Sequence, residues 1–244
     1  MNFSNLPTVV KNLLIINGIF FLVKITGLGD FGGVPMDHWL GLHFFASPLF
    51  KPWQLVTHMF MHGGIVHLAL NMFGLFMFGP PLEYRWGSRK FLAFYMLTGI
   101  GAALFYSGVH VFEYRQLLSY MDPAAIELVK REGAGILMEL QNYTDPDMGR
   151  LNELLNMPMV GASGALYGVL LAFGLTFPEV PLIMFPLPIP IKARYFVFIF
   201  AGLSVFNAIQ NNPNDNVAHL AHLGGMLVGY VLLKLWDRRR PMDF

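Results

Sequence analysis

Two apolar stretches of the chain begin with a side chain that could take part in acyl transfer. Ser163 lies in the run Gly161-Ala162-Ser163-Gly164, and His222 lies near the start of a later stretch. A serine hydroxyl is a poor nucleophile unless a nearby base takes its proton. Histidine, with an unperturbed pKa of about 6.5, suits that role at neutral pH. No carboxylate occupies a matching position, so the pair predicts a catalytic dyad without a third member.

A third motif could supply hydrogen-bond donors for an oxyanion. His67 and Asn71 are four residues apart in another apolar stretch, so both would lie on one face of a helix. Their side-chain N–H groups, with the backbone N–H of Ser163 at a helix N-terminus, could stabilise the negative charge that develops during acyl transfer. Tyr167 follows Ser163 by one turn and could pack against the imidazole of His222.

Glycines are placed so that two helices could approach closely. Gly164 and Gly168 form one pair with a four-residue spacing, and Gly225 and Gly229 form another. Such pairs of small residues let helix backbones pack closely in lipid. His222 precedes Gly225 by three residues and therefore shares its helix face. These spacings predict that the serine helix and the histidine helix are in contact.

The composition indicates that most of the protein surface faces lipid. Apolar residues make up 55% of the 244, charged residues only 13%, and the mean hydropathy is +0.52. A soluble domain carries about a quarter charged residues. The formal net charge of +1 gives no field that would recruit nucleic acid. The absence of cysteine excludes disulfides, thiolate catalysis and cysteine-based zinc sites.

Six apolar stretches are long enough to cross a bilayer, which takes roughly 20 residues. They run over residues 10–26, 56–78, 91–112, 160–177, 193–209 and 217–236. The first carries no cleavage signal and is expected to remain as a helix. We therefore predict an all-α polytopic membrane protein built as a six-helix bundle. Basic residues favour cytoplasmic N- and C-termini, because most would then lie in inside loops: Lys11, Arg85, Arg89, Lys90, Lys192, Arg194, Arg238, Arg239 and Arg240.

This topology would bring the three polar motifs to a similar depth. The second, fourth and sixth stretches would all run from outside to inside, so that their N-terminal ends lie near the outer face. Ser163 would be one turn into its span, and His67 and His222 one to three turns into theirs. At a rise of 1.5 Å per residue, all three would lie within roughly 5–17 Å of the outer boundary.

The whole chain, residues 1–244, is predicted to be one membrane domain with an insertion at about 113–157, between the third and fourth stretches. In the insertion, Asp122 is expected to cap a helix that has Pro123 at its first position. That helix would either cap the bundle at the outer membrane surface or provide a docking site for a partner. The proline-rich run at 178–190 is predicted to be a rigid cytoplasmic connector.

Together, the motifs resemble those of the rhomboid family of intramembrane serine proteases. The resemblance covers all six stretches and rests on Gly161-x-Ser163-Gly164, His67-x-x-x-Asn71, and Ala221-His222-Leu223-Gly224-Gly225 with Gly229. It implies a rhomboid-like fold with Ser163 as the nucleophile and His222 as the general base. His67 and Asn71 would be oxyanion-hole donors together with the serine amide. Tyr167 would support the imidazole, and the motif glycines would support the packing around it.

The resemblance also implies a substrate and a location. The substrates would be single-span membrane proteins, cut near the outer face of the plasma (inner) membrane after lateral entry near the second and fifth spans. No cofactor, metal ion or nucleic acid is implied. The first loop, residues 29–53, would form a hairpin in the outer leaflet. Gln54 follows Trp53 where many family members have a Trp-Arg pair, and Glu83 matches a structural glutamate of the family.

Several of these residues also have simpler explanations. Ser163, taken alone, could be a small residue that permits helix packing. His58 and His62 have a spacing that could bind zinc, but no HExxH motif follows and no acid lies near them, which favours hydrogen bonds that brace the first loop. His219 could have a structural hydrogen-bonding role, and Glu83 could belong to an interfacial charge cluster.

Three other functions stay open on the sequence alone. An inactive relative would bind membrane clients, although such proteins usually lose the serine or the histidine, which are both present here. A transporter or channel would use intramembrane histidines to move protons or ions, but no inverted repeat is visible. A metal-dependent membrane peptidase would lose its activity with a chelator.

Overall fold

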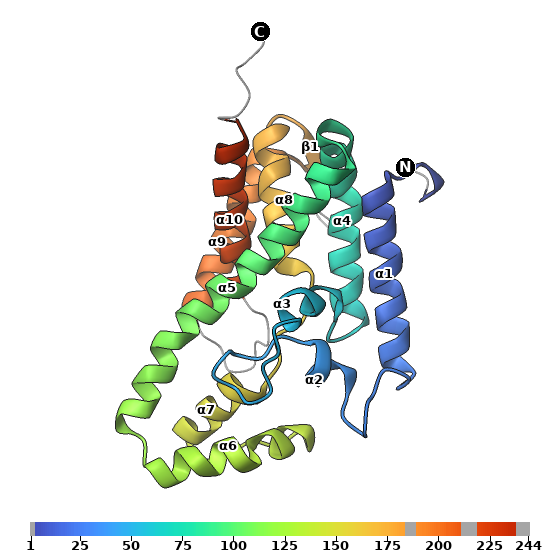
Figure 1. Cartoon of the computed structure of the whole chain (residues 1–244). Coiled ribbons are helices and arrows are strands. Elements are labelled where there is room, and N and C mark those ends of the chain that lie inside the picture. The colour runs from blue at the N-terminus through green and yellow to red at the C-terminus, as the bar shows by residue number, and fades with distance from the viewer. Residues whose placement is uncertain (1–2, 184–188, 211–218, 238–244) are drawn as a thin grey trace.

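The computed structural model describes residues 3–183, 189–210 and 219–237, which form a bundle of helices (Figure 1). The helices of the bundle are α1 (Thr8–Ile25), α4 (Ile65–Trp86), α5 (Ser88–Tyr120), α8 (Ser163–Thr176), α9 (Ala193–Gln210) and α10 (His219–Asp237). The shorter elements are η1 (Phe3–Asn5), α2 (Met36–Leu40), α3 (Gln54–Thr57), η2 (His58–Phe60), α6 (Pro123–Met138), α7 (Pro146–Asn156), β1 (Pro181–Ile183) and β2 (Pro190–Lys192).

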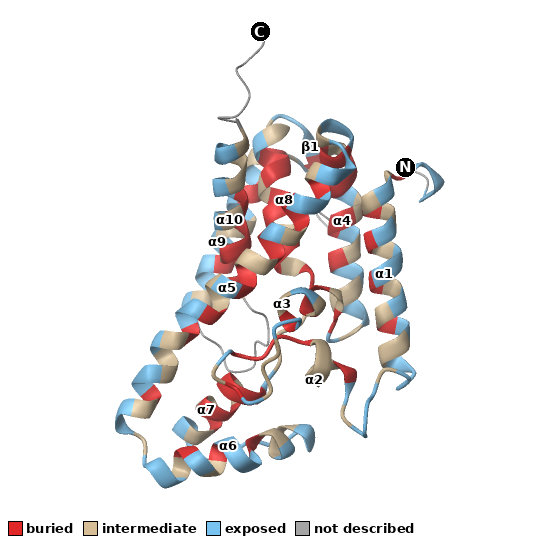
Figure 2. Ribbon diagram, in the orientation of Figure 1, coloured by how far each residue is buried: buried red, intermediate tan, exposed pale blue. Residues whose placement is uncertain are grey.

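Helix α8 is the central element of the bundle. It packs against α4, α5, α9 and α10, and buried residues follow these contacts (Figure 2). Its 14 residues include no charged side chain. A helix that is apolar all round is stable only where other elements or lipid cover every side. The apolar sequence of α8 therefore suits its central position. With 14 residues, the helix is shorter than the roughly 20 residues that a complete span needs.

The apolar helices confirm the predicted fold class, an all-α membrane protein. Among the described residues, four helices are long and apolar enough to cross a membrane: α1, α4, α5 and α9. Their outward surfaces carry exposed apolar side chains, for example Phe73, Phe198 and Ile209. The count of six spans stays a prediction, since α8 is short and residues 217–218 of the last stretch lie outside the described residues.

The first turn of α1 and the last turn of α10 lie at the same end of the bundle (Figure 1). That arrangement is compatible with both termini being on one side of a membrane. The side itself stays a prediction, and the basic residues 238–240 on which it partly rests lie outside the described residues.

The second predicted span begins later than the sequence suggested. A stretch from residue 56 was expected, but α4 starts at Ile65 and is preceded by the short helices α3 and η2. Between η2 and α4 the chain is irregular and contains Gly63 and Gly64. Two adjacent glycines disfavour a helix because they lose the most backbone entropy on ordering. The helix therefore restarts after them, only two residues before His67.

The insertion forms a small packed unit beyond one end of the bundle. Helix α5 has 33 residues, about 50 Å at 1.5 Å per residue, so it extends well past the predicted end at residue 112 (Figure 1). Its last turns meet α6 and α7 in a separate apolar cluster: Phe44, Leu117, Ile126, Val129, Leu151, Leu154 and Leu155. The predicted cap is confirmed, since the Asp122 side chain accepts a hydrogen bond from the Ala124 amide.

The proline-rich run contains regular structure. Strand β1 pairs antiparallel with β2, with Pro181 opposite Lys192. Glu179, just before β1, forms ion pairs with Lys192 and Arg194 across this connection. Residues 184–188, the middle of the predicted connector, lie outside the described residues.

Glu83 ties the start of α1 to the end of α4. Its buried carboxylate accepts hydrogen bonds from the amides of Val9 (2.9 Å) and Val10 (2.8 Å), and from the Ser88 hydroxyl (2.6 Å). The first amides of a helix have no acceptor within the helix, and a negative charge is favourable there. This carboxylate therefore caps a helix other than its own.

Helices α8 and α10 are in contact through their backbones. A side chain at Gly225 would overlap the carbonyl oxygen of Gly164, and one at Gly229 would come within 3.2 Å of the Gly168 Cα atom. A side chain at Gly168 would lie 3.1 Å from the Gly225 carbonyl oxygen. The two glycine pairs therefore interlock, as their spacing predicted, and the helices could not lie this close with larger residues.

We expect Gly225→Ala to destabilise the protein, because the added methyl group must push α8 and α10 apart. Overpacking of this kind costs about 1–3 kcal/mol. Thermal denaturation in detergent micelles would show a lowered midpoint. Gly202→Ala on α9 is the matched control, since no atom lies within 4 Å of the added group. Equal midpoints for the two variants would contradict this account of the packing.

Candidate active site

The hydroxyl of Ser163 and the imidazole of His222 are in hydrogen-bond contact. The serine Oγ lies 2.9 Å from the histidine Nε2, across the interface between α8 and α10. His222 is buried, with 6% of its surface exposed. For the hydroxyl to be activated, it must donate its proton to an unprotonated Nε2. The residues that the sequence singled out for a dyad are therefore brought together at the distance that proton transfer requires.

The ring of Tyr167 holds the imidazole from one side. The two rings are stacked, with centroids 4.0 Å apart and planes 7° from parallel. Tyr167 also meets Phe200 of α9 edge to face, with ring centroids 6.3 Å apart. The imidazole plane is thus held between the serine helix and its own helix. This stacking limits rotation about the histidine side chain.

Ser163 is the first residue of α8, and not one turn into it as the sequence suggested. The first helical hydrogen bond of α8 runs from the Leu166 amide to the Ala162 carbonyl, at 3.0 Å. The amide of Ser163 is therefore not used within the helix, and it lies where the helix dipole is positive. Gly161, just before, has a φ of 130° and donates its amide to the His58 carbonyl. A side-chain-bearing residue rarely adopts that backbone conformation.

His67 lies beside the serine. A Cβ atom at Gly161 would be 2.8 Å from the Nε2 of His67 and 3.7 Å from the Oγ of Ser163, so only a glycine leaves room for the imidazole here. The other ring nitrogen of His67, Nδ1, accepts the amide proton of Gly63 at 3.4 Å. A neutral imidazole with Nδ1 as acceptor carries its proton on Nε2. This tautomer places an N–H donor on the side of the ring that faces Gly161.

Asn71 lies one turn further along α4 and is buried. Its side-chain amide donates to the His67 carbonyl at 2.9 Å, which leaves one amide hydrogen for another acceptor. Among the described contacts, the amide does not reach the Ser163 hydroxyl. The structure therefore places Asn71 next to His67 without joining it directly to the dyad.

The other histidines are not arranged as metal ligands. His58 and His62 are four residues apart, but the chain leaves helical geometry after Phe60, so the two side chains do not share a helix face. The Nδ1 of His58 is instead bonded to the Gln54 carbonyl at 2.8 Å. Among residues 3–183, 189–210 and 219–237, no group of three metal-binding side chains is found. The ring of His219 meets His222 edge to face, at 5.7 Å.

Gln54 braces the first loop at the position where family members often have arginine. It is fully buried, and its Oε1 atom accepts hydrogen bonds from the amides of His43 (3.3 Å) and Lys51 (3.0 Å). Its Nε2 atom donates to the carbonyls of Trp39 (3.4 Å) and Leu49 (3.2 Å). A neutral amide thus uses both its donor and its acceptor to hold the loop together.

Two charged residues near the site were not among the predicted ones. Lys24 and Asp37 form an ion pair close to His62. Lys24 in the last turn of the first apolar stretch was the available signal, but its acidic partner lies in the short helix α2, which the sequence pattern did not predict.

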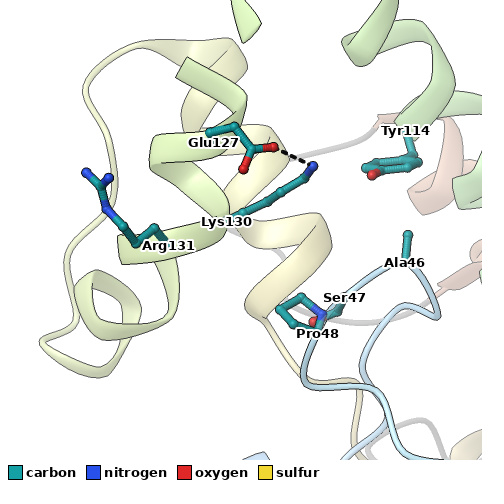
Figure 3. Close-up of a pocket in the computed structure, with 7 residues that line it drawn as sticks. All are labelled: Ala46, Ser47, Pro48, Tyr114, Glu127, Lys130 and Arg131. Carbon is teal, nitrogen blue, oxygen red and sulfur yellow. Dashed lines mark hydrogen bonds and ion pairs between the residues drawn. The ribbon is translucent and has the colours of Figure 1, made fainter. Parts of the chain in front are cut away.

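A separate hollow lies away from the dyad. Figure 3 shows it between the first loop at Ser47, the end of α5 at Tyr114, and α6. Its basic side chains are paired with acids: Lys130 with Glu127, and Arg131 with Glu132. None of the residues that line it belongs to the three polar motifs.

A family model described as the rhomboid domain matches residues 49–238 of the chain. The chain belongs to the rhomboid family. The matched region includes all three polar motifs and α3 to α10, so the predicted family membership is confirmed. With its apolar helices, this rhomboid is a multi-pass membrane protein.

Individual relatives are distant in sequence. Rhomboid-like protein 16, chloroplastic, of Arabidopsis thaliana is 25% identical over 78% of this chain and 50% of its own length. Rhomboid protease AarA of Providencia stuartii is 26% identical over 74% of this chain and 54% of its own length. Putative rhomboid protease YdcA of Bacillus subtilis is 25% identical over 79% and 71%. The chain thus spans about half the length of the first two relatives.

Three buried histidines around the first loop should make this rhomboid acid-sensitive. Burial lowers the pKa of His43, His58 and His62 each to about 4. Below pH 6.5 the unfolded chain binds protons that the folded protein excludes, so the free energy of unfolding falls as the pH drops from about 6.5 to about 4. The loss is up to about 1.4 kcal/mol per pH unit for each histidine.

Thermal denaturation in micelles at several pH values would test this expectation. The midpoint should fall on acidification through this window, and His62→Gln, which cannot titrate, should show a shallower fall. The same pH dependence in the variant and the parent would show that His62 titrates normally in the folded protein.

Proposed function

We propose that this rhomboid is an intramembrane serine endopeptidase that uses a Ser163–His222 dyad. The observation that carries the proposal is the 2.9 Å contact between the serine Oγ and the histidine Nε2, with the imidazole stacked on Tyr167. Two of the similar proteins are named as rhomboid proteases, which supports a hydrolase acting on peptide bonds. A merely structural serine would not need an oriented base.

The reaction follows from the roles of these groups. His222 takes the Ser163 proton on Nε2 as Oγ attacks the carbonyl carbon of the scissile bond, and a tetrahedral oxyanion forms. The protonated imidazole then gives the proton to the leaving amine, and the C–N bond breaks. Water hydrolyses the resulting serine ester with the same histidine as base. Without an acidic third member, the stacked Tyr167 ring provides the orientation of the imidazole.

The oxyanion would be bound by donors from two helices. The Ser163 amide at the start of α8 is not used within that helix. The Nε2–H of His67 lies against Gly161, and Asn71 has one amide hydrogen left after bonding to the His67 carbonyl. Such donors, fixed before the charge develops, are the largest single contribution in many hydrolases.

Single-span membrane proteins are the proposed substrates. A transmembrane helix hides its backbone in internal hydrogen bonds, so a segment must unwind before its carbonyl can reach the serine. Residues that disfavour a helix would ease that step. Helix α9, which packs on α8 and α10 and carries exposed phenylalanines, is the proposed side of lateral entry, together with α4. The outer leaflet of the plasma membrane is the proposed depth of the cut.

Cleavage in liposomes tests the dyad. A labelled single-span substrate with an Ala-Gly stretch near its outer end is incubated with the parent, Ser163→Ala and His222→Ala. We expect both variants to lose at least about 10³-fold in cleavage rate, and a chelator to have no effect on the parent. Cleavage by folded Ser163→Ala would exclude the serine mechanism. Inhibition of the parent by the chelator would favour a metal-dependent peptidase.

A pair of substitutions tests the oxyanion donor at His67. His67→Leu removes the side-chain N–H and should lower kcat by about 10²–10³-fold with little change in KM, as for loss of one oxyanion donor. His67→Gln keeps an N–H donor of similar reach and should retain more activity. Equal rates for the two variants, with unchanged melting midpoints, would show that the donor does not contribute.

A further inference from the structure

Lys24 turns inward at the end of α1. Its ammonium group lies 2.5 Å from the Asp37 carboxylate in α2 and donates a hydrogen bond of 2.6 Å to the His62 carbonyl. Only 20% of the lysine side chain is exposed. A lysine that only anchored a helix at a membrane boundary would extend its ammonium group to water. This one instead joins three segments of the chain that are distant in sequence.

The carbonyl that Lys24 holds belongs to the turn just before α4. The next residue of that turn, Gly63, donates its amide to the Nδ1 of His67. The ring of His62, which is 1% exposed, lies edge to face against the His67 ring at 5.1 Å. Both contacts that the turn makes with the proposed oxyanion donor therefore lie within one residue of the carbonyl that the lysine fixes.

The two glycines of the turn are not held by packing. Gly63 is exposed, and a side chain at Gly64 would meet no atom within 4 Å. Adjacent glycines have wide conformational freedom. A charge-assisted hydrogen bond is about twice as strong as a neutral one. The bond from Lys24 has a charged donor, whereas the other hydrogen bonds described for this turn join neutral groups.

Asp37 keeps the ammonium group in place. It lies in the first turn of α2, where a negative charge is favourable, and the loop before α2 is held by the bond from the Met36 amide to Asp30 at 2.9 Å. The carboxylate offsets part of the cost of removing the ammonium group from water. Lys24 consequently has a fixed position from which it can orient the His62 carbonyl.

We propose that Lys24 is a positioning residue for the oxyanion hole: by holding the His62 carbonyl it fixes the turn whose Gly63 amide keeps His67 in the tautomer with the proton on Nε2. This inference rests on the proposed protease function for its effect on rate. Its effect on the tautomer of His67 is independent of any substrate.

The test compares Lys24→Met, which keeps the side-chain length but removes the charge and the donors, with Lys24→Arg, which keeps both. Lys11→Met, at the other end of α1, is the matched control for loss of one positive charge from the same helix. Cleavage in liposomes gives kcat and KM. Nitrogen-15 NMR of histidine-labelled protein in micelles reports the tautomer of His67, with its signal assigned from His67→Gln.

We expect Lys24→Met to lower kcat about 10- to 100-fold, less than the complete loss of one donor, with KM within twofold of the parent. Its His67 signal should change from a single Nε2–H tautomer to a mixture. Lys24→Arg should restore the tautomer and most of kcat, and Lys11→Met should match the parent.

A single Nε2–H tautomer in folded Lys24→Met would overturn the proposal, whatever happens to the rate. So would an unchanged kcat in an active protein. If the parent cleaves no substrate, the protease function fails, but the NMR comparison still decides whether Lys24 sets the state of His67.

Discussion

The backbone contact between α8 and α10 is the constraint on which the site depends. The side chains of Ser163 and His222 must bring an oxygen from one helix and a nitrogen from the other to 2.9 Å. That is possible only if the helix axes lie unusually close, and a side chain at Gly225 would prevent it by overlapping the Gly164 carbonyl oxygen. In lipid, where the hydrophobic effect does not drive helices together, such packing is also a main source of association. The same glycines thus contribute to both stability and geometry.

The second constraint is the irregular segment that precedes α8 and the one that precedes α4. Helix α8 begins at Ser163 and α4 begins just before His67, so the reactive residues lie at or near helix N-termini and not within continuous spans. These preceding segments are joined, because the Gly161 amide donates to the His58 carbonyl. The pair Leu42 and Met159 adds two further backbone bonds of 2.8 Å between the first loop and the segment before the serine. The backbone bonds to the first loop and to His58 therefore position the start of α8, and the glycines set its distance from α10.

The sequence predicted the parts of this arrangement that depend on local pattern. The length of the apolar stretches predicted the helices, and the four-residue spacing of the glycines predicted the contact of α8 with α10. It failed where competing local signals decide the outcome, as at Gly63 and Gly64, where an apolar stretch suggested a continuous helix. Helix α7 was overlooked although Asp145 and Pro146 repeat the signal of Asp122 and Pro123. Met148, Leu151 and Leu155 also follow a helical spacing, so the cap and the apolar pattern both indicated this helix.

Other features were beyond the sequence because they depend on distant segments meeting. The partner of Lys24 comes from the short helix α2, and the bonds of Gln54 reach four backbone groups that share no periodic pattern. The position of the insertion also depends on contacts between segments that are distant in sequence. Arg150 of α7 binds Glu113 of α5 through two hydrogen bonds, of 2.6 and 3.0 Å, and α7 leads within a few residues to Met159 and the serine. Because α5 also packs on α8 and α10, this ion pair closes a ring of contacts from the bundle through the insertion and back to the reactive serine.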